Sequence, residues 1–248
     1  AYRSRIAVWT AQSLAAYDVQ AGRGYNVHDK LRDASLATWL DAARIAVVQE
    51  QNRLTCCALS GAVEWTAPLD GPVGSLAATA RGVAAARPHQ MVWFDLAGAV
   101  LDTQAFAAPQ RIVGAGGSVL ATGNDRIARR YDKEGSLLWE DELPLVPTWL
   151  ATVGGFVVAG DAGGGAVAIA PDGKLIRDAR PAAAVGAYVA AAGSLVRVEQ
   201  EGTTVRARTL DGVELWQRKL DAPVSWVMDG DAVVAVAYGR TIGFRSVT

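Results

Sequence analysis

Residue types that commonly build active sites are scarce in this sequence. It has two histidines, His28 and His89, which lie far apart and lack the His/Cys spacing of a zinc site. A Ser/His/Asp triad therefore has few ways to assemble, and the Gly-x-Ser-x-Gly pattern of a nucleophile elbow does not occur. The glycine-rich stretch 160–165 lacks the features of a phosphate loop or an EF-hand, so we expect a hairpin tip there. The sequence predicts a protein that is not an enzyme, with no catalytic residues, no metal ligands and no cofactor.

Long apolar runs, a strong charge of either sign and widely spaced cysteines are also missing. No run approaches the ~18 residues that a membrane helix needs, and no signal peptide is visible. The net charge of −1 gives no basis for binding nucleic acid or a membrane surface. The two cysteines, Cys56 and Cys57, are neighbours and cannot join distant segments, which favours a reducing compartment. We therefore expect a cytoplasmic protein, with the periplasm as the alternative, that neither binds nucleic acid nor inserts into a membrane.

What the sequence does contain is a glycine-centred turn that recurs six times. The intervals between these glycines are 39, 37, 37, 38 and 39 residues. The six glycines are Gly22, Gly61, Gly98, Gly135, Gly173 and Gly212. Aspartate often precedes the glycine, as in a short hairpin where Asp caps the backbone and Gly adopts a positive φ. A fixed period of this length is the signature of a repeat architecture, and it predicts a β-propeller.

Each repeat contains four short strand patterns separated by turns. In the repeat of Gly135 they cover Ile112-Val113, Val119–Thr122, Ile127–Asp132 and Ser136–Glu140. Short strands with turn residues at every break are typical of up-and-down sheets. The second strand reads as apolar on both faces in every repeat, as a blade that lies between two other blades requires. Each repeat is therefore expected to form one four-stranded antiparallel blade.

We expect a single all-β propeller domain over residues 1–248, with seven blades. The first recognisable strand, from Ile6, corresponds to the second strand of a repeat, and a seventh turn glycine would fall at about 249–251, past Thr248. The chain would then hold 26 strands, as five complete blades and two three-stranded ones. Six blades are the alternative, if the strands from Val233 onward form no blade. The last blade would have an unpaired edge, and a longer parent protein is expected to supply the missing strand.

The repeats resemble those of pyrroloquinoline-quinone-like (PQQ-like) propellers. The segment Ala16–Asn26 is similar to the family motif A-x-D-x-x-T-G-x-x-x-W, with Ala21 in place of Thr and Asn26 in place of Trp. The Gly-x-x-x-Trp end of the motif recurs in Gly61–Trp65, Gly135–Trp139 and Gly212–Trp216, whereas Asp102 and Arg177 take the tryptophan position in two other repeats. The Gly-His…Trp-Asp signature of the neighbouring WD40 family is absent. The resemblance implies that Trp65, Trp139 and Trp216 are buried between blades.

This resemblance implies one of two functions. The family contains quinone dehydrogenases, and also scaffolds without a cofactor, such as the lipoprotein of the outer-membrane β-barrel assembly machinery. Quinone-dependent alcohol dehydrogenases carry adjacent cysteines bonded to each other. Here Cys56 and Cys57 lie in a predicted strand, where successive side chains point to opposite faces, so we interpret them as packing residues.

We therefore expect a non-catalytic scaffold that mediates protein–protein interaction, as part of a larger protein or complex. Its partner would be another protein or a further domain of the same chain. The alternative is a propeller that binds a small molecule or a quinone cofactor.

Two groups of residues are candidates for partner binding. The aromatic residues at one aligned position of the first strands are Trp39, Trp149, Tyr188 and Trp226, which either form a binding face or pack between blades. The densest basic cluster is Arg126, Arg129 and Arg130. Strand alternation places Arg129 on the face of Tyr131 and the other two arginines on the opposite face. This cluster is either a solvated blade edge or a site for an anionic partner.

Overall fold

The chain folds into short antiparallel strands joined by turns. A computed structural model describes residues 5–18, 22–28, 31–108, 110–163, 165–177, 184–191, 194–229, 233–238 and 241–246. This described part contains no helix, and so none that could cross a membrane. The contacts between residues group the chain into two compact units, residues 1–142 and 143–248, and each unit is described by itself.

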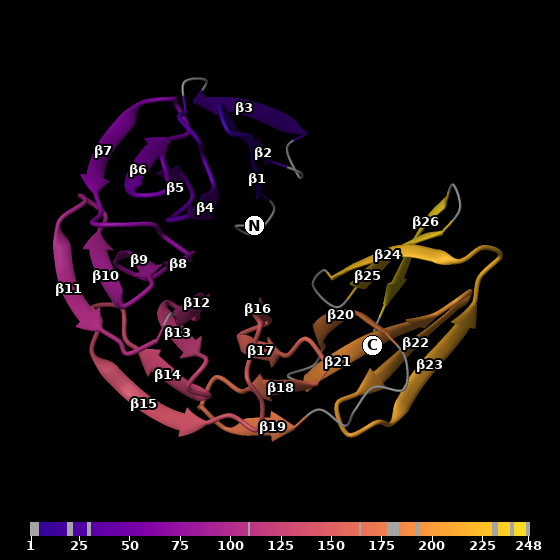
Figure 1. Ribbon diagram of the computed structural model, residues 1–248. Coiled ribbons are helices and arrows are strands. Elements are labelled where there is room, and N and C mark those ends of the chain that lie inside the picture. The colour runs from indigo at the N-terminus through magenta and orange to yellow at the C-terminus, as the bar shows by residue number, and fades with distance from the viewer. Residues whose placement is uncertain are drawn as a thin grey trace. The chain divides into compact units, whose positions relative to one another are not determined.

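Unit 1 contains four sheets, each built from consecutive strands (Figure 1). The first sheet has three strands, β1 (Arg5–Trp9), β2 (Leu14–Asp18) and β3 (Arg23–His28). The second consists of β4 (Leu36–Trp39), β5 (Arg44–Gln49), β6 (Arg53–Ala58) and β7 (Val63–Pro68). The third consists of β8 (Ser75–Ala78), β9 (Gly82–Arg87), β10 (Gln90–Asp95) and β11 (Val100–Ala105). The fourth consists of β12 (Gln110–Ala115), β13 (Ser118–Gly123), β14 (Ile127–Tyr131) and β15 (Leu137–Glu142).

Unit 2 contains three sheets with the same order of strands. The first consists of β16 (Trp149–Val153), β17 (Phe156–Gly160), β18 (Ala166–Ile169) and β19 (Leu175–Arg177). The second consists of β20 (Ala184–Ala191), β21 (Ser194–Glu201), β22 (Thr204–Thr209) and β23 (Glu214–Lys219). The third has three strands, β24 (Val224–Asp229), β25 (Val233–Tyr238) and β26 (Thr241–Ser246). The described residues thus form 26 strands in five four-stranded and two three-stranded sheets, which confirms the predicted blades.

The turn glycines behave as the period predicts. All six adopt a positive φ, between +61° and +106°. At Gly135, the carboxylate of Asp132 accepts hydrogen bonds from the backbone N–H groups of Glu134, Gly135 and Ser136, at 2.8, 2.8 and 2.9 Å. Partial burial alone would raise the pKa of Asp132, but these hydrogen bonds outweigh it and hold the pKa below its ordinary value. A side chain at Gly135 would be strained at φ +106°, and its Cβ would lie 2.7 Å from Oδ2 of Asp102.

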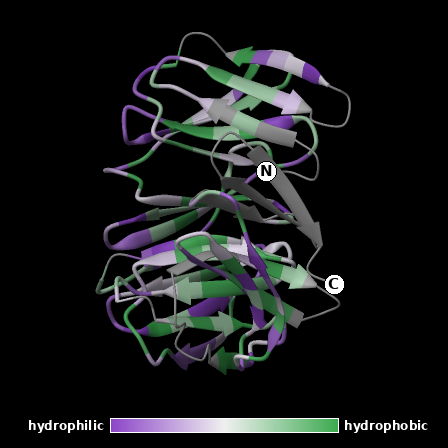
Figure 2. Ribbon diagram, turned by 90° about the vertical axis from the view of Figure 1, so that its right-hand side faces the viewer, coloured by the Kyte–Doolittle hydropathy of each residue, from purple (hydrophilic) through white to green (hydrophobic). Residues whose placement is uncertain are grey.

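The second and third strands of the complete blades carry the core. All six residues of β13 are buried, as are five of six in both β5 and β9. The outer strands β7, β15 and β23 are mostly exposed. Green, hydrophobic stretches run along strands in Figure 2, whereas many turns are purple. The second strands therefore pack on both faces as predicted, with an exception in β21 that involves charged residues and is described below.

The motif tryptophans are half-buried rather than buried. Trp65 on β7 stacks on Phe94 of the next sheet, with ring centroids 6.3 Å apart, and its Nε1 donates a hydrogen bond to the carbonyl of Leu96 at 3.0 Å. Trp139 and Trp216 are also half-buried. These residues lie on outer strands that are mostly exposed, so their burial is partial rather than complete.

Candidate functional site

Two of the predicted aromatic residues, Trp149 and Tyr188, come together in unit 2. Trp149 begins β16, and Tyr188 lies in β20, the first strand of the next sheet. Their ring centroids are 6.3 Å apart, and the ring planes are tilted by 39°. Trp149 is 38% exposed, whereas Tyr188 is 8% exposed. The pair therefore presents one accessible aromatic side chain that is supported by a buried one.

The indole ring of Trp149 packs against the backbone of β17. Trp149 pairs with Gly160, and a Cβ atom at Gly160 would overlap the indole ring, so only glycine leaves room for it. The next residue, Asp161, accepts hydrogen bonds from the N–H groups of Gly163 and Gly165, both at 2.8 Å. These bonds confirm the hairpin tip expected at 160–165. We refer to Trp149 and Tyr188 as the Trp149 surface.

The four aromatic candidates do not share one position, which corrects the alignment made from the sequence. Trp39 ends β4 and pairs with Ile45 beside the hairpin loop, whereas Trp149 begins β16 and pairs with the last residue of β17. The loop after the first strand comprises residues 40–43 in one blade and 154–155 in the other. Trp39 lies 22 residues before Gly61, whereas Trp149 lies 24 residues before Gly173, and the two residues lie at different points of their first strands.

Trp39 is a core residue. It is 5% exposed and belongs to the cluster that contains Leu14, Val27 and Ile45. The packing interpretation therefore applies to it, and it does not belong to a binding face. The side chain of Trp226 lies outside the described residues, so its role stays a prediction.

The three arginines of the basic cluster form ion pairs and hydrogen bonds with residues of their own blade. Arg126 forms an ion pair with Glu142 at 3.2 Å, and Arg129 forms one with Asp125 at 2.7 Å. Nε of Arg130 donates to the hydroxyl of Ser118 at 2.9 Å. These contacts favour the solvated edge over a site for an anionic partner.

The predicted alternation along this strand agrees with the ring contacts. The Arg129 guanidinium lies 5.9 Å from the centroid of the Phe106 ring. The Tyr131 ring contacts the same phenyl ring edge-on at 6.3 Å. Arg129 and Tyr131 therefore share one face of β14.

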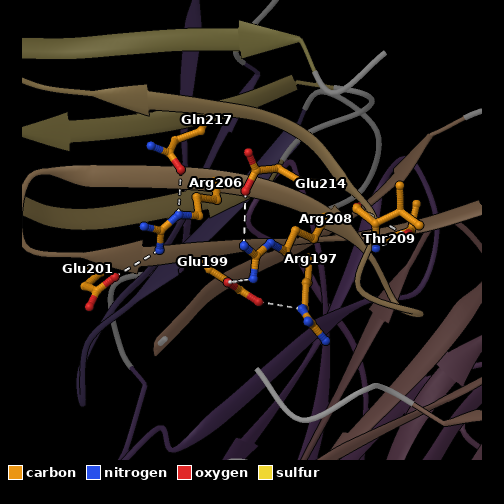
Figure 3. Close-up of polar contacts among 9 residues, drawn as sticks. Arg197, Glu199, Glu201, Arg206, Arg208, Thr209, Glu214 and Gln217 are labelled. Carbon is orange, nitrogen blue, oxygen red and sulfur yellow. Dashed lines mark hydrogen bonds and ion pairs between the residues drawn. The ribbon is translucent and has the colours of Figure 1, made fainter. Parts of the chain in front are cut away.

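A buried charged network in unit 2 was not predicted from the sequence (Figure 3). Nε of Arg197 donates to Oε1 of Glu199 at 2.7 Å, and both residues are almost fully buried, at 2% and 1% exposed. Arg208 donates to Oε2 of Glu199 at 3.3 Å and to Oε2 of Glu214 at 3.1 Å. The segment Leu195–Val198 reads as an apolar second strand, and that interpretation is wrong at Arg197. The network could have been predicted from one feature of the sequence, the charged residues that alternate with uncharged ones along β21 and β22.

This network lies on the same face of its sheet as Tyr188. The register places Tyr188 opposite Arg197, and Arg197 opposite Arg208, and directly opposed residues share a face. Leu195, two residues before Arg197, packs in the cluster that contains Phe156 of β17. This face therefore points toward the sheet that carries Trp149. The network stabilises the face on which Tyr188 lies, and Tyr188 in turn contacts Trp149.

The two cysteines are free, and both are fully buried in β6. Cys56 packs in one core cluster and Cys57 in another, as expected for successive residues of a strand. Burial raises the pKa of Cys56 from 9.0 to about 12 and that of Cys57 to about 11. The packing interpretation of this pair is therefore supported, and no disulfide joins the two residues.

Both thiols are expected to react slowly in the folded protein. Their raised pKa values lower the thiolate fraction near neutral pH by roughly a hundredfold to a thousandfold, and burial adds a steric barrier. The measurement is the rate of colour release from a thiol-reactive disulfide reagent, with and without denaturant. Fast reaction of either thiol in the native protein would contradict the burial, and a lack of reaction after unfolding would indicate a disulfide.

Comparisons with known proteins agree on the type of repeat. A PQQ-like repeat model described as outer membrane protein assembly factor BamB matches residues 7–246. No curated protein sequence matches the chain. Among solved structures, BamB from Moraxella catarrhalis matches with a TM-score of 0.60 and 14% identity, over 95% of this chain and 79% of that one.

Two further structures are similar at low sequence identity. A chain of the mitotic checkpoint complex matches with a TM-score of 0.68 and 11% identity, over 99% of this chain and 85% of that one. The dihydro-haem d1 dehydrogenase NirN in complex with DHE matches with a TM-score of 0.70 and 12% identity, over 98% of this chain and 61% of that one. At such identities these similarities show the fold alone, and they confirm the β-propeller.

Proposed function

Because the chain belongs to the BamB family of PQQ-like propellers, we propose that it is a non-catalytic scaffold that binds another protein through the Trp149 surface. The partner is a separate protein or a further domain of the same chain. The two free cysteines support the cytoplasm as its location, which fractionation of native cells tests.

The observation that carries this proposal is the packing of the exposed Trp149 ring against Gly160 and Tyr188. Tryptophan is among the residues that contribute most to protein–protein interfaces when they are rigid and become desolvated. Trp149 is 38% exposed, yet Gly160 and Tyr188 hold its ring from two sides. Little side-chain entropy is therefore lost when a partner covers it.

Replacing Trp149 by alanine is expected to weaken partner binding by about thirtyfold or more, the effect of losing a hot-spot residue. The partner is first captured from a lysate of the native organism on the immobilised wild-type protein. The dissociation constant of the purified partner is then measured for the wild type and for Trp149→Ala.

Trp9→Ala is the matched control. Trp9 is 40% exposed, but it lies in β1 of unit 1. The Trp9→Ala variant should bind the partner like the wild type. Equal binding by Trp149→Ala would contradict the role of this surface, and failure of the wild type to capture any partner would contradict the scaffold function itself.

The second candidate is a propeller that binds a quinone or another small molecule. One of the similar structures is a dehydrogenase, which is the reason to consider this alternative. That similarity extends to the fold alone. Among the described residues, no three His, Cys, Asp or Glu side chains are grouped so that they could hold a metal ion. An absorbance spectrum of the purified protein distinguishes the two functions, since a chromophore that co-purifies would favour the alternative.

A further inference from the structure

The outer strands β15 and β23 each carry an exposed leucine at a β-bulge. Each strand is the last of its sheet and pairs with one neighbouring strand, so its other edge is open. In both strands the register with the third strand shifts by one residue, and the extra residue is Leu138 in β15 and Leu215 in β23. A bulge at a sheet edge changes the direction of the side chain that it carries.

These leucines belong to exposed apolar surfaces. Leu138 is 56% exposed, and its neighbour Leu137 is 51% exposed. Leu215 is 45% exposed, and Val213, immediately before β23, is 57% exposed. Neighbouring large apolar side chains that stay exposed on a folded protein are typical of interaction sites.

The outer strands β7 and β11, in the other two complete sheets of unit 1, use the bulge differently. The extra residue of β7 is Glu64, which forms an ion pair with Arg44 at 3.8 Å. The extra residue of β11 is Leu101, which packs against the core cluster that contains Trp93 and Tyr131. An exposed leucine at the bulge therefore distinguishes β15 and β23 from these two strands.

Beyond the leucine, the two strands carry opposite charges. Strand β15 ends in three acidic residues, Glu140–Glu142, whereas β23 ends in a glutamine and two basic residues, Gln217–Lys219. All six of these residues are exposed. Each strand therefore presents an apolar part followed by a charged part, in the same order along the chain.

The charges are available to a partner. Glu140 and Glu142 each form an ion pair with an arginine of their own sheet, at 3.5 and 3.2 Å, but their side chains are 58% and 66% exposed. Within the described part of the chain, no ion pair involves Asp141, Arg218 or Lys219. Asp141 and Arg218 occupy equivalent positions, two residues after the tryptophans of their strands.

The order of these parts favours contact between β15 and β23 of different copies. When the two strands lie side by side in the same direction, leucine meets leucine and the acidic end meets the basic end. Two copies of β15 do not fit in this way. In the same direction their acidic ends repel each other, and in opposite directions each leucine meets an acidic end. The same reasoning excludes contact between two copies of β23.

We propose that this protein associates with itself through these surfaces, with β15 of one copy against β23 of the next. The exposed leucines form the apolar centre of the contact, and the charged ends select the partner strand and its direction. Because the two surfaces differ, the copies add head to tail, into a ring or an open chain. Neither strand carries Trp149 or Tyr188, so this contact goes beyond the proposed scaffold function and does not depend on it.

Sedimentation velocity of the purified protein, over a series of protein and salt concentrations, tests the association. We expect the mean mass to rise with protein concentration, with a dissociation constant on the order of 100 µM, as for a small and transient interface. The association should weaken as salt is added, because salt screens exposed charges. A wild type that stays monomeric at about ten times this concentration in low salt, or an association that salt does not change, overturns the proposal.

Substitutions at the bulges locate the contact. Leu138→Asp and Leu215→Asp should each weaken the association about tenfold or more, because each places a charge in the apolar centre. Val63→Asp is the matched control, since Val63 is 47% exposed and lies two residues after its turn glycine in β7, as Leu137 does in β15. The control should associate like the wild type. Unchanged association in either leucine variant contradicts the proposal.

An exchange of charges shows which surfaces meet. Asp141→Arg and Arg218→Asp should each associate about tenfold more weakly than the wild type, because each variant carries like charges on its two surfaces. An equimolar mixture of the two variants should recover most of the association, since each altered surface then meets one of opposite charge. If the mixture associates as weakly as the separate variants, β15 and β23 do not meet, and the proposal is overturned.

Discussion

Replacing Glu199 by alanine is expected to lower the free energy of unfolding by about 3–5 kcal/mol, because it removes a buried carboxylate that accepts hydrogen bonds from two arginines. Glu199 accepts from Arg197 at 2.7 Å and from Arg208 at 3.3 Å. The side chain of Arg197 is 2% exposed, so water cannot replace the lost carboxylate. The measurement is urea unfolding, in which the midpoint should fall while the slope with denaturant stays constant.

Glu201→Ala is the control for this prediction. Glu201 lies two residues further along β21 and pairs with Arg206 at 2.9 Å, but its side chain is 66% exposed. An exposed ion pair contributes about 0–1 kcal/mol, so this variant should unfold nearly like the wild type. Equal and small losses in both variants would show that solvent reaches Glu199.

A double variant separates the cost of removing one partner from the value of the ion pair. Arg197→Met with Glu199→Leu replaces both buried charges by apolar side chains of similar size. Such replacements are often neutral or stabilising, so the double variant should be clearly more stable than Glu199→Ala. If it is not, the network contributes specific packing that apolar side chains cannot reproduce.

The repeat was predictable because its local chemistry is the same in every copy. Gly135 needs a positive φ whichever blade surrounds it, and Asp132 caps its hairpin through three backbone N–H groups. The opposite faces of Cys56 and Cys57 follow from strand alternation alone. Such features depend on a few neighbouring residues, so the sequence is sufficient to locate them.

The candidate site was only partly predictable, because it depends on register between strands. The difference between the loops 40–43 and 154–155 moves Trp39 into the core and Trp149 to an exposed strand end. The sequence does not show how the first two strands of a blade pair, so this difference could not be predicted from it. The buried pair of Arg197 and Glu199 depends on register too, because the charges meet only when β21 and β22 align.

Replacing Trp93 by alanine is the other change with a large expected effect, a loss of about 3–5 kcal/mol in the free energy of unfolding. Trp93 is fully buried, and its ring contacts Tyr131 of the next sheet. Removing it leaves a cavity at the joint between two sheets of unit 1. Trp9→Ala, at a 40% exposed position, should change the stability by about 0.5 kcal/mol or less.

A swap of two residues tests why Trp93 matters. Trp93→Cys combined with Asp102→Trp reproduces the opposed pair Cys56–Trp65 of the preceding blade. A ring at position 102 would meet Gly135 as Trp65 meets Gly98, since a Cβ atom added at either glycine would lie 2.7 Å from the outer-strand residue of the preceding blade. The double variant should therefore recover much of the stability that Trp93→Cys alone loses. If it recovers none, the two positions are not interchangeable.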